Sequence, residues 1–63
     1  MGKTVREVLT ILQRDGWAVN RQTGSHRILL HPTKPGTVTV AGNPQKEIPP
    51  GTYNSILKQA GLK

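Results

Sequence analysis

The chain has 63 residues, no cysteine, and nine lysines and arginines against three acidic residues, which gives a net charge of +6 at pH 7. A chain of this length is expected to form one domain, residues 1–63, around a small core. Without cysteine it cannot form a disulfide or a thiolate metal site. Positive charge spread along a folded chain favours a polyanionic partner, most often a nucleic acid, although an acidic protein would satisfy the same charge.

No stretch of the chain approaches the roughly 20 apolar residues that a membrane-spanning helix requires. The first residues, 1–4, run directly into a helix signal and contain no apolar secretory region. These two features predict a cytoplasmic protein with no membrane partner.

The first predicted element is a helix that begins with a capping box at Thr4-Val5-Arg6-Glu7. Apolar residues then recur at the helical spacing i, i+3, i+4 and i+7. They are Val5, Val8, Leu9 and Leu12, and Ile11 widens the stripe. Gly16, after Asp15, predicts the end of the helix because glycine readily adopts the left-handed conformation.

Three short strands are predicted after this helix. Residues 17–21 form the first strand, with Trp17 and Val19 expected on one face. Residues 22–25 follow as a turn whose length suits a hairpin, and residues 26–31 form the second strand.

The third strand, residues 37–41, alternates strictly between apolar and polar residues, so Val38 and Val40 are expected to point inward. Pro32 ends the second strand because proline cannot donate a ladder hydrogen bond. A Pro-Gly turn at residues 33–36 joins the two strands.

A polar connection, residues 42–50, leads to a second helix for which Gly51 or Thr52 is the expected cap. Its apolar stripe again has helical spacing. The stripe consists of Tyr53, Ile56, Leu57 and Ala60. Gly61 closes the helix. Two amphipathic helices and one three-stranded antiparallel sheet, in the order α-β-β-β-α, predict a two-layer α+β domain with one sheet face left open.

The chain offers few residues for a metal site or a covalent nucleophile. His26 and His31 are five apart on one predicted strand, so they point to opposite faces and cannot share a metal. The three acids lie in separate elements, and Ser25 beside His26 has no acid nearby to complete a catalytic triad. No metal site, cofactor site or glycine-rich nucleotide loop is therefore predicted.

His26 is the residue best suited to chemistry on RNA. The 2′-hydroxyl of RNA is an internal nucleophile, so a cleaving enzyme requires a base, an acid and cations for the phosphorane charge. Imidazole exchanges protons near neutral pH and can act as the base. The candidates for RNA contact are Ser25, Arg21, Arg27, Lys34 and Lys46. Most lone histidines are structural, and that interpretation is kept for His31 beside Pro32.

Several short segments together resemble the HicA family of bacterial toxins, also called YcfA-like proteins. The segments are Gly16-Trp17, Gly24-Ser25-His26, His31-Pro32, Gly36-Thr37-Val38-Thr39-Val40, Ile48-Pro49-Pro50-Gly51-Thr52 and Ile56-Leu57-Lys58-Gln59-Ala60-Gly61-Leu62. No single segment is specific, but their order and spacing are, and the resemblance covers residues 5–62.

The resemblance implies a fold like that of a double-stranded RNA-binding domain and metal-independent cleavage of messenger RNA, which arrests translation. It also implies that His26 is catalytic and that a HicB antitoxin covers it. Many relatives have a second histidine where this chain has residues 41–45, so a two-histidine mechanism is not expected. If Leu29 and His31 face the helices, His26 lies on the open face. The alternatives are a non-catalytic module for double-stranded RNA and a degenerate toxin kept for partner binding.

Overall fold

The computed structural model describes residues 3–63; Met1 and Gly2, part of the leading segment in which no secretory signal is expected, lie outside the described residues. The described chain contains two helices and five strands. In chain order these are β1 (Lys3–Thr4), α1 (Val5–Arg14), β2 (Ala18–Thr23), β3 (His26–Leu30), β4 (Val38–Ala41), β5 (Glu47–Ile48) and α2 (Pro50–Gln59).

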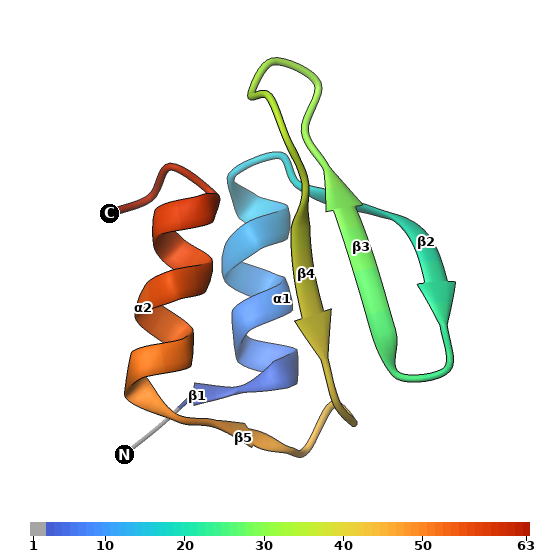
Figure 1. Ribbon diagram of the computed structural model, residues 1–63, viewed down its shortest axis with the longest axis vertical. Helices are drawn as coiled ribbons and strands as arrows, with labels where there is room; N and C mark the ends of the chain where they lie inside the picture. Colours follow the sequence, from blue (N-terminus) through green and yellow to red (C-terminus); the bar gives the residue numbers. More distant parts are fainter. Residues whose placement is uncertain (1–2) are drawn as a thin grey trace.

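The main sheet is antiparallel with the order β2-β3-β4, and the two helices run side by side next to β4 (Figure 1). The β2–β3 hairpin extends beyond the helices. This arrangement confirms the predicted α+β class and the order α-β-β-β-α. Strands β1 and β5 were not predicted; each has two residues, too few to show an alternating pattern, and they pair with each other.

Helix α1 begins and ends as the sequence predicts. The Thr4 side chain accepts a hydrogen bond from the Glu7 N–H, and the Glu7 carboxylate accepts one from the Thr4 N–H, so the capping box is complete. Asp15 is the last helix-like residue, and Gly16 follows with φ of 108°. The residues of α1 that are buried are Val5, Val8 and Leu12.

The strand predicted at residues 17–21 forms, but it spans Ala18–Thr23 and Trp17 precedes it. Trp17 is buried, whereas Val19, which pairs with Leu29, is 39% exposed and does not join the core. Strand β2 forms the edge of the sheet and is exposed along its whole length, because the helices do not reach it (Figure 1). The turn is also shorter than predicted, since Thr23 pairs with His26 and only Gly24 and Ser25 remain between the strands.

One face of β3 and β4 forms the sheet side of the core. Leu29 pairs with Val38, and Arg27 pairs with Val40; Leu29 and both valines are fully buried. The complete buried set is Val5, Val8, Leu12, Trp17, Leu29, Val38, Val40, Ile48, Ile56 and Ala60. The alternation predicted for residues 37–41 is therefore confirmed, and side chains of opposite parity on β3 and β4 lie on the open face.

Helix α2 begins two residues earlier than a cap at Gly51 predicts and three residues earlier than a cap at Thr52 predicts. Pro49 occupies the cap position without a side-chain hydrogen bond and Pro50 is the first helical residue, so neither Gly51 nor Thr52 is the cap. Proline is well tolerated there because the first N–H groups of a helix have no partner within the helix. Ile56 and Ala60 of the predicted stripe are buried, and Tyr53 is partly buried. Neither helix in the described part is long and apolar enough to cross a membrane.

Candidate functional site

The hairpin between β2 and β3 presents His26 at one corner of the open face. Gly24 has φ of 57°, and glycine at the first position of a two-residue turn is typical of hairpins that follow the natural strand twist. His26 is the first residue of β3, where it pairs with Thr23 on one side and Ala41 on the other. Its side chain is exposed, and none of the side-chain hydrogen bonds found in residues 3–63 involves it. The ring is therefore free to meet a ligand.

The strand register gives the neighbours of His26 on the open face. Arg21 pairs with Ile28, two pairs along the strands from the Thr23–His26 pair, so the Arg21 side chain lies on the same face as His26. Arg21 is exposed and supplies a cation near His26. At the far end of β3, Leu30 is 40% exposed. The expectation that His26, Ile28 and Leu30 share the open face agrees with the burial of Leu29.

Arg27 has a different environment from its neighbour His26. It lies on the helix side of β3 and is half-buried. Its guanidinium donates a 2.9 Å hydrogen bond to the Gly42 carbonyl and a longer one, 3.5 Å, to the Ser25 carbonyl. The Gly42 N–H also donates to the Ser25 carbonyl. Arg27 thus ties the hairpin turn to the segment after β4, which holds His26 beside Ala41.

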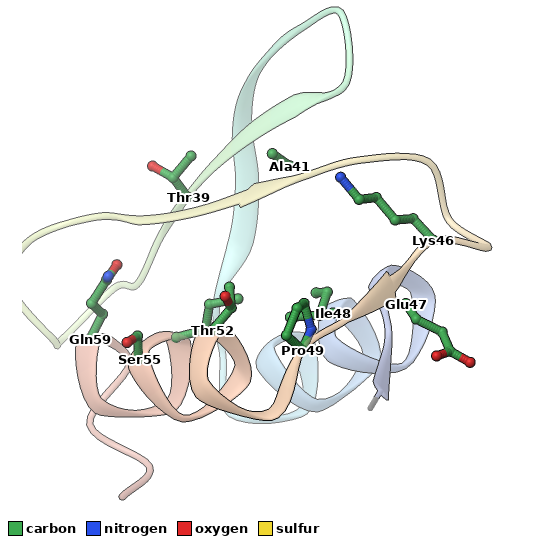
Figure 2. A pocket seen from close by; sticks show the side chains of 10 residues that line it. Thr39, Ala41, Lys46, Glu47, Ile48, Pro49, Thr52, Ser55 and Gln59 are labelled. Carbon is green, nitrogen blue, oxygen red and sulfur yellow. The ribbon is translucent and has the colours of Figure 1, made fainter. Parts of the chain in front are cut away.

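Lys46 approaches the same corner from the segment after β4. Gly42 has φ of 115°, and a Cβ built there would lie 2.7 Å from Lys46 Cδ, so the lysine stem runs against the glycine backbone. Its ammonium extends toward a cavity beside Ala41 (Figure 2). Lys46 is therefore the second cation near His26, on the side opposite Arg21.

Lys34 lies beyond the other end of β3, in the connection between β3 and β4. Its ammonium is 2.6 Å from the Asp15 carboxylate and donates to the Ala60 carbonyl at 2.9 Å. This ion pair holds the pKa of Asp15 below its usual value, chiefly through the hydrogen bond from Lys34. The structure therefore gives Lys34 a structural role that joins α1 to the end of α2.

His31 is bonded on both ring nitrogens. Nδ1 accepts from the backbone N–H groups of Thr33 and Lys34, both at 3.1 Å, so Nε2 carries the proton and donates to the Asp15 carbonyl at 2.6 Å. The ring also packs edge-to-face with Trp17, with centroids 5.2 Å apart. The indole N–H of Trp17 is buried without a hydrogen-bond partner in the described residues.

The acidic residues are too dispersed to form a metal site. No group of three or more histidines, aspartates or glutamates lies close enough to hold a metal ion within residues 3–63. Glu7 is committed to the capping box, and the Thr4 backbone N–H lowers its pKa. Asp15 pairs with Lys34, and Glu47 lies on β5, away from both of the other acids.

The cavity beside Ala41 was not predicted from the sequence. It has a volume of about 320 Å³ and lies between β4 and α2. Its α2 wall includes Thr52, Ser55 and Gln59. These three have the helical spacing i, i+3 and i+7, so a polar stripe on the predicted helix was the available signal.

Comparison with known proteins gives one result. The family model described as the HicA toxin of bacterial toxin–antitoxin systems matches residues 5–62. No curated protein matches the chain.

Proposed function

The chain belongs to the HicA family of toxins from bacterial toxin–antitoxin systems, and from that premise we propose that it is an endoribonuclease that cleaves messenger RNA in the cytoplasm and arrests translation. The single observation that supports this activity is the exposed imidazole of His26, which makes no side-chain hydrogen bond within residues 3–63 and lies between the cations Arg21 and Lys46. A metal-free reaction on RNA requires this combination of a base and cations.

In the proposed reaction, His26 accepts the proton of a ribose 2′-hydroxyl as that oxygen attacks the adjacent phosphorus. The bond from phosphorus to the 5′ oxygen breaks, and this oxygen takes up a proton from solvent water. The hydroxide that remains takes the proton from His26, which restores the neutral imidazole. The products are a 2′,3′-cyclic phosphate and a 5′-hydroxyl. Arg21 and Lys46 offset the charge on the phosphorane, which is the usual role of cations in phosphoryl transfer. Ser25, in the turn that carries His26, contacts the RNA backbone.

The antitoxin that accompanies a toxin of this family is proposed to cover the open face. Leu30 is 40% exposed there, and Ile28 is partly exposed between it and His26. An apolar strip that continues to the catalytic residue suits a protein partner, which would bury the strip and His26 together. Inhibition would then result from blocked access to His26.

The test compares wild type with His26→Ala on messenger RNA, in the presence of EDTA. We expect the substitution to lower the cleavage rate about 100- to 10,000-fold, the usual contribution of a general base. A 2′-deoxynucleotide at the cleaved position should block the wild-type enzyme. Undiminished cleavage by His26→Ala would refute the catalytic assignment, and loss of wild-type activity in EDTA would refute the metal-free mechanism. Tight binding of duplex RNA without cleavage would favour the non-catalytic module.

A further inference from the structure

A cavity between β4 and α2 is lined by Ala41, the strand partner of His26, and shares only Lys46 with the catalytic arrangement proposed above (Figure 2). Its volume is about 320 Å³, at the lower end of the range for small-molecule sites. The residues that line it come from β4, β5, α2 and the connections between them. They are Thr39, Ala41, Lys46, Glu47, Ile48, Pro49, Thr52, Ser55, Ile56 and Gln59.

One wall of the cavity is the free edge of the main sheet. The Gly42 N–H donates to the Ser25 carbonyl at 3.1 Å, so the Gly42 N–H points toward the β3 side. Backbone groups along an antiparallel strand alternate in direction, so those of Val40 and Val38 also point toward β3. The N–H and C=O groups of Thr39 and Ala41 therefore point away from the sheet, toward the cavity. They offer donors and acceptors at fixed positions.

The opposite wall supplies side chains that can both donate and accept hydrogen bonds. Thr52, Ser55 and Gln59 are exposed and face β4 from successive turns of α2 (Figure 2). Between the two walls, Ile48 and Ile56 form an apolar floor, and each is at most 5% exposed. An apolar floor with polar groups along both walls matches a planar heterocycle whose edge carries donors and acceptors.

The position of the cavity relates it to the RNA. Ala41 lines the cavity and is also the cross-strand partner of His26, which places their side chains about 5 Å apart on one face. Lys46 lies at the same end and can pair with a phosphate (Figure 2). We propose that the cavity binds the base of the nucleotide next to the cleaved phosphate and so determines which sequences are cut. This inference rests on the proposed ribonuclease activity.

RNA fits this cavity better than an added protein strand. A β-strand would require a longer row of free backbone groups, whereas β4 offers only those of Thr39 and Ala41 to the cavity. Base edges of single-stranded RNA are commonly read by such isolated backbone and side-chain groups. The net charge of +6 also favours the polyanion.

The binding test uses the full chain with His26→Ala, so that RNA is not cut, and the four ribonucleoside 5′-monophosphates as probes. We expect at least one nucleotide to shift the NMR signals of the Thr39, Ala41 and Ser55 amides. Ser55→Tyr, which fills the cavity, should abolish these shifts. Asn54→Tyr is the matched control, because Asn54 is on the same helix but does not line the cavity. Shifts that are absent for all four nucleotides, or that persist in Ser55→Tyr, would overturn the proposal.

The second test sequences the RNA ends produced by variants with His26 intact. We expect Gln59→Ala, a mild exposed change, to weaken the preference at one position beside the cut by about five- to tenfold, the effect of one lost hydrogen bond. Unchanged preferences in both Gln59→Ala and Ser55→Tyr would refute the base site while leaving the ribonuclease intact. Unchanged preferences with loss of antitoxin neutralisation would assign the cavity to the antitoxin instead. Failure of the ribonuclease proposal would be recognised separately, by the absence of RNA cleavage by the wild-type protein.

Discussion

The two ends of β3 carry the two histidines of the chain, and the two rings differ in how they are bonded. His31, just after the strand, uses both ring nitrogens and packs against Trp17. His26, the first residue of the strand, is exposed and makes no side-chain hydrogen bond within the described chain. The odd spacing between them puts one ring toward the helices and the other on the open face. A histidine whose nitrogens are committed stabilises the fold, whereas one with free nitrogens can exchange a proton with a substrate.

The largest expected effect on stability is at His31. Replacement by alanine leaves the N–H groups of Thr33 and Lys34 and the carbonyl of Asp15 without partners and removes the contact with Trp17. We expect His31→Ala to lower the free energy of unfolding by about 2–4 kcal/mol, measured by urea denaturation. Cleavage per folded molecule should be unchanged. The matched control, His26→Ala, should change the free energy of unfolding by no more than about 0.5 kcal/mol. An equal loss of unfolding free energy in His31→Ala and His26→Ala would contradict the proposed difference between the two histidines.

The sequence predicted the parts of this arrangement that depend on local patterns. Strand parity was enough to separate His26 from His31, and the capping box and Gly16 fixed the limits of α1. The partners of Lys34 could not be predicted, because Asp15 and the Ala60 carbonyl are distant in sequence and meet only after the helices pack. The burial of Val19 could not be predicted for a related reason. Alternation shows which face of a strand is apolar, but not how far the helices extend over it.

Lys34, beyond one end of β3, and Arg21, on the open face near His26, are expected to differ in the same way as the two histidines. Lys34→Met retains the aliphatic stem but loses the bonds to Asp15 and Ala60. Because this ammonium is partly exposed, we expect the free energy of unfolding to fall by about 1 kcal/mol or less, without loss of cleavage. Arg21→Met on the open face should give the opposite result, with weaker RNA binding and a salt dependence reduced by about one phosphate contact. If Lys34→Met weakened RNA binding as strongly as Arg21→Met, the prediction that Lys34 contacts RNA would be supported.

The smallest expected effect is the contribution of Asp15 to the pH dependence of stability. The Lys34 hydrogen bond lowers the pKa of Asp15 in the folded protein, so the folded state binds the proton less readily than the unfolded chain. The stabilisation is therefore present above the unfolded pKa and is lost as the pH falls through the folded pKa. Asp15→Asn should flatten this part of the acid side of the stability curve, measured by urea denaturation at several pH values. Part of the acid dependence should remain, because the Thr4 backbone N–H also lowers the pKa of Glu7. An unchanged curve in Asp15→Asn would mean that the Asp15–Lys34 pair contributes nothing to folding, which would leave the hydrogen bonds of His31 as the main polar contribution at this end of β3.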